Sequence, residues 1–112
     1  MNSSSLLKGT LQTIILKLLE NKAEMYGYEI TQKVKEISSG KIVLTQGALY
    51  PALHRLEAEG LLESYTQTVD NRVRKYYRLT TEGQSGVKEQ LKEAQDFISQ
   101  LQLILNLKTN LA

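Results

Sequence analysis

The sequence predicts a mainly helical α+β fold that contains one small β-hairpin. Apolar side chains recur every three or four positions in three segments before residue 60, which indicates amphipathic helices. Two β-prone runs, residues 61–68 and 73–80, then flank a short polar turn, and helical spacing resumes after residue 80. A helix followed at once by a short basic hairpin is typical of a winged helix-turn-helix. We therefore expect that fold, with a long C-terminal helix appended.

Length and composition limit the class of protein. The 112 residues suit one domain with an appended helix, which we divide into a winged helix-turn-helix DNA-binding domain, residues 1–80, and a dimerisation helix, residues 81–112. The apolar fraction is 41%, no apolar run approaches the ~20 residues that span a bilayer, and no signal peptide is evident. The lack of cysteine excludes disulfides and thiolate metal sites. We expect a cytoplasmic protein with no membrane partner, cofactor or metal.

Apolar spacing predicts the first two helices. Residues 5–21 are expected to form a helix with Ser5 as N-cap, and residues 26–37 a second helix that ends at Gly40. We expect a polar break at residues 21–25, and a connector resembling an edge strand at residues 41–44. The apolar positions of the two stripes are Leu7, Leu11, Ile14, Ile15, Leu18 and Leu19, then Tyr26, Ile30, Val34 and Ile37.

The third helix has clear end signals. Thr45 is a favourable N-cap and Gly60 a favourable residue just beyond the C-terminus. Pro51 removes one backbone hydrogen bond, so we expect it to kink the helix or to delay its regular part. The apolar face consists of Leu49, Ala52, Leu53 and Leu56, which leaves Tyr50 predicted to be exposed.

The hairpin and the last helix complete the prediction. Asp70 and Asn71 suit the turn of the hairpin, and alternation in the second strand predicts that Lys75, Tyr77 and Leu79 share one face. Thr80 or Thr81 is expected to cap a helix that runs to about Lys108. This helix carries a heptad seam formed by Val87, Leu91, Ala94, Ile98, Leu101 and Leu105.

Charge and motif together predict contacts with double-stranded DNA. Residues 1–80 carry 11 basic and 8 acidic side chains, and residues 72–78 concentrate four cations without an acid. We interpret these cations as phosphate contacts, and the start of the third helix as the part that touches base edges. The Gln46 side chain can hydrogen-bond adenine, and the Ala48 methyl can contact the thymine methyl. The candidate DNA-binding residues are Thr45, Gln46, Ala48, Tyr50, His54, Arg55, Asn71, Arg72, Arg74 and Lys75, with Arg78 in the same basic cluster.

The heptad seam predicts a homodimer, which would place two recognition helices on a palindromic operator. The candidate dimer interface consists of Leu7, Leu11, Val87, Leu91, Ala94, Ile98, Leu101 and Leu105. Excess apolar surface near the centre of such a dimer suggests a pocket for a small aromatic or phenolic effector, although these side chains can equally well just fill the interface. The candidate pocket residues are Leu7, Leu11, Ala94, Phe97 and Ile98.

Two other functional classes fit the sequence less well. An enzyme is disfavoured because the sequence contains no nucleophile–base pair, no glycine-rich phosphate loop and no evident carboxylate pair. The lone His54 cannot form a metal site of the usual kind. The stronger alternative is a winged-helix module for protein interaction or dimerisation that binds no specific DNA. The basic hairpin and the intact start of the third helix argue against it.

Three blocks of sequence resemble the PadR family of bacterial transcriptional regulators, in its subgroup with a single C-terminal helix. The blocks are YGYEI at residues 26–30, GALYPALHRLEAEGLL at residues 47–62 and RKYYRLT at residues 74–80. The resemblance covers about residues 5–105 and implies a winged helix-turn-helix dimer that represses transcription, often with release by a small effector. Two features depart from the family. The tip of the hairpin lacks the usual Gly and Pro, and the last helix lacks the Trp that lines an effector cavity in some relatives.

Overall fold

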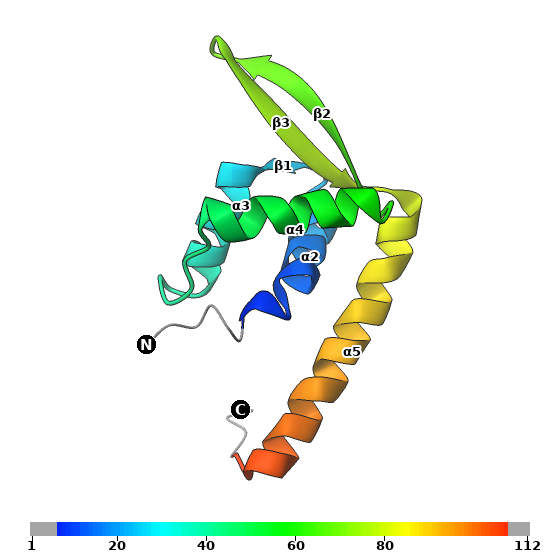
Figure 1. Ribbon diagram of the computed structural model, residues 1–112. Coiled ribbons are helices and arrows are strands. Elements are labelled where there is room, and N and C mark those ends of the chain that lie inside the picture. The colour runs from blue at the N-terminus through cyan, green and yellow to red at the C-terminus, as the bar shows by residue number, and fades with distance from the viewer. Residues whose placement is uncertain (1–6, 108–112) are drawn as a thin grey trace.

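The computed structural model describes residues 7–107 and confirms the mainly helical winged helix-turn-helix with a long C-terminal helix (Figure 1). The first part of the chain supplies α2 (Leu11–Asn21), β1 (Met25–Tyr26) and α3 (Gly27–Ile37). The second part supplies α4 (Gln46–Ala58), the hairpin strands β2 (Leu62–Val69) and β3 (Arg72–Leu79), and α5 (Thr81–Leu105). The hairpin, which we call the wing, and the distal part of α5 project in opposite directions. No helix within residues 7–107 is long and apolar enough to cross a membrane.

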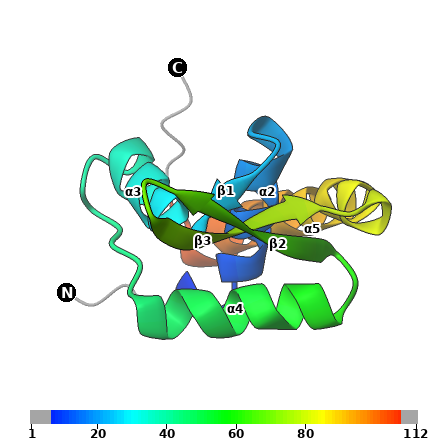
Figure 2. The same ribbon diagram turned by 90° about the horizontal axis from the view of Figure 1, so that it is seen from above.

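A single hydrophobic core joins the helices to the base of the wing. α2 lies at its centre and contacts α4, α5 and β3, while α4 runs along one side of the molecule (Figure 2). The apolar stripes predicted for α2, α3 and α4 supply most of the buried side chains, as amphipathic helices should. The fully buried side chains are Ile15, Leu16, Ile30, Leu49, Leu53, Leu56, Leu62, Tyr77 and Val87.

The sheet has three antiparallel strands in the order β1-β3-β2. β1 was not predicted. Met25, expected to end a polar break, pairs with Tyr77, and Tyr26, expected to begin the second helix, pairs with Tyr76. A strand of two residues has no periodicity to detect, so only the three-dimensional arrangement reveals it. Within the wing, β2 pairs with β3 along the full length of both strands, from Leu62↔Leu79 at the base to Val69↔Arg72 at the tip.

The tip of the wing is a two-residue turn. Asp70 and Asn71 have φ angles of 51° and 64°. Positive φ at both central residues is the type I′ geometry that two-residue hairpins favour, and Asp and Asn tolerate it. The predicted turn is therefore confirmed, with the strands one residue longer at the tip than expected.

The N-terminal helix differs from its prediction. Leu7 and Lys8 are helical as predicted, but a turn at Gly9 and Thr10 interrupts the helix, and α2 begins at Leu11. The Thr10 amide and hydroxyl both donate to the Leu7 carbonyl oxygen, at 2.9 and 3.1 Å, beside the helix-disfavouring Gly9. The predicted cap at Ser5 lies outside the described residues. Residues 41–44 are not a strand. The Ile42 amide instead donates to Ser38 Oγ at 2.9 Å.

The N-caps predicted at Thr45 and Thr80 are confirmed. Thr45 Oγ1 accepts from the Ala48 amide at 3.2 Å, and Thr80 Oγ1 accepts from the Gly83 amide at 3.0 Å. Gly60 takes the predicted left-handed position after α4, with φ of 79°. After α3 that position belongs to Ser39, with φ of 55°, and Gly40, with φ of 80°, follows it. α4 is continuous from its first residue with Pro51 inside it, so the expected delay of its regular part does not occur.

Candidate nucleic-acid interface

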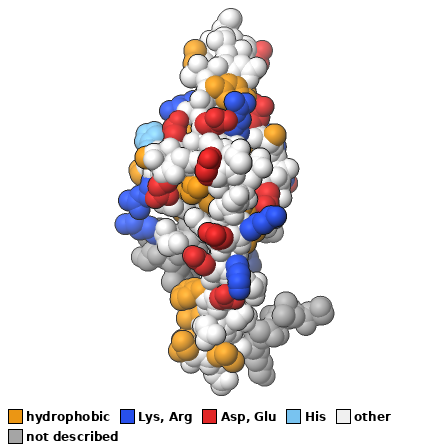
Figure 3. Space-filling view, turned by 90° about the vertical axis from the view of Figure 1, so that its right-hand side faces the viewer, with side chains coloured by type: hydrophobic (Ala, Val, Ile, Leu, Met, Phe, Trp, Pro, Cys, Tyr) orange, Lys and Arg blue, Asp and Glu red, His pale blue; other side chains and the backbone are white. Residues whose placement is uncertain are grey.

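One face of α4 packs on the core and the other lies open. Leu49, Leu53 and Leu56 are fully buried, which turns the opposite face outward. The predicted base-contacting side chains at the helix start are exposed, as are those on its rim: Thr45, Gln46, Ala48, His54 and Arg55. The single histidine marks this face in the space-filling view (Figure 3). The N-terminus of a 13-residue helix also carries a partial positive charge and free amide groups, which favour an anion there.

Tyr50 is half-buried, which lies between the predicted exposure and the alternative of a core position. Its ring packs against Gly27 at the start of α3, where a Cβ would lie 2.5 Å from the Tyr50 hydroxyl oxygen. Gly27 therefore makes room for Tyr50, and the aromatic ring joins α4 to α3. The sequence offered no signal for this contact, because it depends on how the two helices cross.

The two faces of β3 behave as the alternation predicts. Tyr77 is fully buried and Leu79 is partly buried, while Arg78 on the opposite face is exposed. The Tyr77 hydroxyl has no hydrogen-bond partner among the described residues, and burial raises its pKa, with smaller contributions from Glu57 and Tyr50.

The four wing cations do not form one free patch. Arg78 Nε donates to Glu63 Oε1 across the strands at 2.8 Å, and the Arg74 guanidinium carbon lies 4.5 Å from the centroid of the Tyr26 ring. Lys75 Nζ lies 3.9 Å from Glu57 Oε1 of α4, a separation typical of a weak surface pair. Arg72, beside the tip residue Asn71, is exposed and forms no ion pair within residues 7–107.

Sequence analysis missed two residues that support the wing. Glu57, on α4, accepts a hydrogen bond from Ser64 Oγ of β2 at 2.6 Å and also faces Lys75. Tyr26, on β1, stacks against Arg74 and meets Tyr76 edge-to-face with ring centroids 5.4 Å apart. The YGYE sequence suggested only a core tyrosine, because β1 itself was not anticipated.

The dimer prediction needs a correction at the start of the heptad seam. Val87 and Leu11 are only 1% and 5% exposed, so both belong to the core of their own subunit, and Leu91 packs against that core. Ala94 and Leu101 are half-buried, whereas the seam residues Ile98 and Leu105 are exposed. Apolar side chains gather over the distal end of α5 (Figure 3), where Phe97, Ile98, Leu103, Ile104, Leu105 and Leu107 are exposed.

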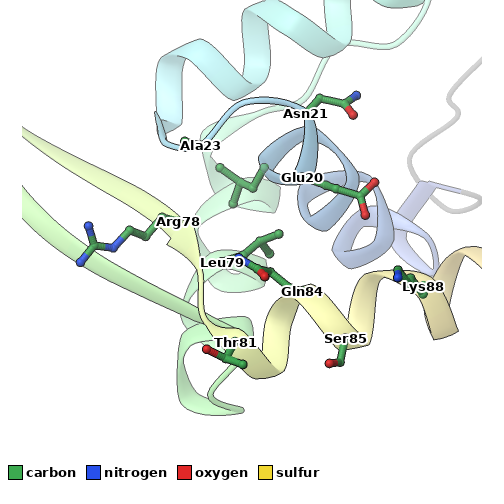
Figure 4. A pocket seen from close by; sticks show the side chains of 10 residues that line it. Glu20, Asn21, Ala23, Arg78, Leu79, Thr81, Gln84, Ser85 and Lys88 are labelled. Atoms are coloured by element: carbon green, nitrogen blue, oxygen red, sulfur yellow. The ribbon is translucent and has the colours of Figure 1, made fainter.

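The predicted effector residues do not meet in one cavity of the subunit. Leu7 and Leu11 line an apolar cavity of about 510 Å³ against Val43, Leu44 and the start of α4. Ala94, Phe97 and Ile98 do not line that cavity. A larger, open hollow of about 940 Å³ lies between the end of α2 and the first turns of α5 (Figure 4). Arg78 is the one wing cation on its rim, and its guanidinium points away from the hollow.

Comparison with known proteins agrees with this architecture. Residues 15–89 match the family model described as the transcriptional regulator PadR-like family. The transcriptional regulator Rv3488 of Mycobacterium tuberculosis is 44% identical over 66 residues, which are 59% of each chain.

Two solved structures extend the likeness to almost the whole chain. A PadR family transcriptional regulator from Eggerthella lenta has a TM-score of 0.78 at 29% identity and covers 93% of this chain and 88% of its own. A transcriptional regulator from Clostridium thermocellum has a TM-score of 0.76 at 30% identity and covers 94% of this chain and 99% of its own. The chain with this exposed recognition helix and basic wing belongs to the PadR-like family of DNA-binding transcriptional regulators, which are not enzymes.

Proposed function

We propose that this protein is a cytoplasmic homodimeric repressor that binds a palindromic operator in double-stranded DNA. The observation that carries the proposal is the open face at the start of α4, beside a wing whose tip presents Arg72 with no ion-pair partner within residues 7–107. In a winged helix, the recognition helix reads the major groove while the hairpin grips the backbone next to it.

The start of α4 is the proposed base-reading element. Gln46 can form a bidentate pair with adenine, and the Ala48 methyl can contact the thymine methyl. The Thr45 hydroxyl oxygen already accepts from the Ala48 amide, so Thr45 is left to donate its hydroxyl proton to a phosphate. His54 and Arg55 lie further along the same exposed face and are proposed as backbone contacts. Tyr50 is half-buried with its hydroxyl end against Gly27, so it is proposed to contact DNA only through its exposed part.

The wing supplies the electrostatic part of binding. Arg72 and Asn71 at the tip, and Lys75 nearer α4, are proposed to contact phosphates. From the tip, the Asn71 side chain can also reach into the minor groove. The Lys75 pair with Glu57 is long and partly exposed, so it costs little to exchange Glu57 for a phosphate.

The distal part of α5 is the proposed dimer contact. Residues 81–112 form the dimerisation segment in this proposal, with residues 1–80 as the DNA-binding domain, although the first turns of α5 also complete the core of that domain. Exposed apolar side chains from Phe97 onward need a partner, and a second copy of α5 offers the complementary heptad surface. The dimer would place two copies of α4 about one DNA turn apart, roughly 34–36 Å, or a multiple of it.

Release by a small aromatic or phenolic effector is a secondary proposal. Its support is the exposed pair Phe97 and Ile98 on the proposed dimer surface, where an apolar cleft between subunits can take a flat ligand. An effector releases DNA only if it binds the DNA-free arrangement more tightly than the DNA-bound one. A thermal-shift screen of planar phenolic compounds, repeated with Phe97→Ala, tests this. A compound must both raise the melting temperature and weaken DNA binding to support it.

Selection of bound duplexes from random DNA tests the main proposal. A repressor of this kind should enrich a palindrome whose halves are separated by about one helical turn. If no sequence is enriched even at low salt, the protein is better explained as a winged-helix module for protein interaction.

A further inference from the structure

Three tyrosine rings lie in a row on one face of the sheet, with an arginine at each end. Arg74 lies over the Tyr26 ring at 4.5 Å, and Tyr26 meets Tyr76 edge-to-face at 5.4 Å between centroids. Tyr76 stacks on Tyr65 at 5.7 Å with an interplanar angle of 17°, and Arg78 lies 5.2 Å from the Tyr65 centroid. We call these five side chains the tyrosine–arginine ladder. Together they form one continuous packed surface, in which each ring or guanidinium touches the next.

The end of the ladder at Tyr26 belongs to the helical body. Tyr26 ends β1, and its amide donates to Glu29 Oε1 in the first turn of α3 at 3.1 Å. Glu29 is held in turn by Lys22 Nζ at 2.6 Å. The other ladder residues lie on β2 and β3, which project from that body (Figure 1). The contact between Arg74 and Tyr26 therefore joins the wing to the body.

The opposite face of the wing is held by α4. Glu57 accepts from Ser64 of β2 at 2.6 Å and lies 3.9 Å from Lys75 of β3. The wing is thus braced from two sides, by α4 on one and by Tyr26 on the other. β1 pairs with β3 only at Tyr77 and Tyr76, so beyond that pairing the wing is a two-stranded ribbon, which twists readily. The side-chain contacts on its two faces therefore bear directly on the angle at which its tip stands.

Arg72 differs from Arg74 although both lie on the same face of β3. Arg72 is exposed at the tip and has no ion-pair or aromatic partner within residues 7–107. Arg74 is half-buried, with its flat guanidinium against a ring. The ring fixes the orientation of the Arg74 guanidinium, whereas the Arg72 guanidinium is free to turn toward a phosphate.

We propose that Arg74 is a positioning residue: its contact with Tyr26 sets the angle between the wing and α4, and Arg72 makes the phosphate contact. This inference rests on the proposed DNA binding and revises the phosphate role that the sequence suggested for Arg74. A wing already at its bound angle loses less conformational freedom on binding, so the ladder raises operator affinity without touching DNA.

Salt-dependent binding to the selected operator separates positioning from phosphate contact, because only a lost phosphate contact lowers the slope of log K against log salt. Tyr26→Leu removes the ring but no charge and should weaken binding about fivefold, as expected for one partly exposed cation–π contact, with an unchanged slope. Arg74→Gln should leave the slope unchanged and should weaken binding no more than Tyr26→Leu, which also removes the contacts of the ring with Tyr76 and Tyr28. The double variant should bind no more weakly than Tyr26→Leu alone, because that substitution already removes the contact with Arg74.

Arg72→Gln is the matched control, because it removes the same charge two residues away. It should lower the slope by about 0.9, and its loss should add to that of Tyr26→Leu. Tyr26→Phe keeps the ring and should bind like the wild type. A slope lowered by about 0.9 in Arg74→Gln, or additive losses in the Tyr26 and Arg74 double variant, would overturn the proposal.

A second measurement needs no DNA. The side-chain protons of Arg74 should resonate upfield in the free wild-type protein and in Tyr26→Phe, because the ring shields them. If these protons show no shielding in the wild type, the ladder is absent in solution and the inference fails. If the shielding is present but the wild type binds no duplex, the proposed function fails instead. If Tyr26→Leu does not fold, the slopes of Arg74→Gln and Arg72→Gln decide alone.

Discussion

Gly83, in the first turn of α5, lies directly against the carbonyl oxygen of Leu61, in the turn that follows α4. The same carbonyl accepts the Thr80 amide at 3.1 Å, and Thr80 Oγ1 donates to the Gly60 carbonyl oxygen at 2.6 Å. The start of the long helix is therefore docked on the end of the recognition helix through backbone.

Gly83→Ala should destabilise the fold by about 3 kcal/mol, because the added Cβ would overlap a backbone oxygen that cannot rotate away. Gly86→Ala is the control one turn later. Its Cβ would meet only Leu61 Cδ2, at 3.4 Å, and alanine favours a helix over glycine by about 1 kcal/mol. Urea unfolding at one protein concentration measures both. Equal stability of the two variants would contradict the close packing of Gly83 against the Leu61 carbonyl oxygen.

Tyr77→Phe should leave the stability unchanged or raise it by about 1 kcal/mol. The Tyr77 ring is fully buried, and its hydroxyl has no partner among the described residues, so the hydroxyl loses hydration without gaining a bond. Thermal unfolding of both proteins near neutral pH measures the difference. A loss of more than about 1 kcal/mol would mean that a bound water or another group satisfies this hydroxyl in solution.

The same residue predicts a pH dependence. Burial raises the pKa of Tyr77 above its usual 10.0, so in strong alkali the unfolded chain loses this proton more easily than the folded protein. The part of the folding stability that depends on this proton is fully present below pH 10 and is lost as the pH rises through the folded pKa of Tyr77. Tyr77→Phe should therefore lose stability less steeply than the wild type above pH 10. Parallel curves for the two proteins in that range would contradict the raised pKa.

Helical elements and their ends were predictable because their signals are local. The caps at Thr45 and Thr80, the stop at Gly60, and the hairpin turn all depend on residues within four positions of each other. The contacts that were missed join distant segments. β1 exists because β3 lies beside it, and Tyr50 is half-buried because Gly27 of another helix makes room for it. No periodicity within either segment encodes these neighbours.

The candidate sites divide in the same way. Exposure of Gln46, Ala48, His54 and Arg55 follows from the apolar face of α4, so it was predictable from spacing. The partners of the wing cations were not predictable, because they depend on which ring or carboxylate lies beside each cation in the folded protein. The heptad seam also misassigned Val87, since the sequence cannot tell a core contact within a subunit from one between subunits.

Charged residues at the distal end of α5 should produce monomers without unfolding the domain. Phe97 and Ile104 are 62% and 76% exposed, so Phe97→Glu with Ile104→Glu removes apolar surface that the subunit itself does not use. Leu91 is avoided because it packs against its own core. Sedimentation equilibrium should show a monomer with an unchanged circular dichroism spectrum. Gln100→Glu, at an exposed polar position of the same helix, should stay dimeric. A dimeric double variant would place the interface elsewhere.

The most direct test of DNA recognition by α4 is the affinity of the wild type and Gln46→Ala for two duplexes, the selected operator and a shuffled sequence of equal length. Fluorescence anisotropy at one salt concentration gives all four dissociation constants. We predict that the wild type prefers the operator, and that Gln46→Ala loses about 1–3 kcal/mol on the operator and much less on the shuffled duplex. Equal affinity of the wild type for both duplexes, or equal losses for Gln46→Ala on both, would contradict base reading by the start of α4.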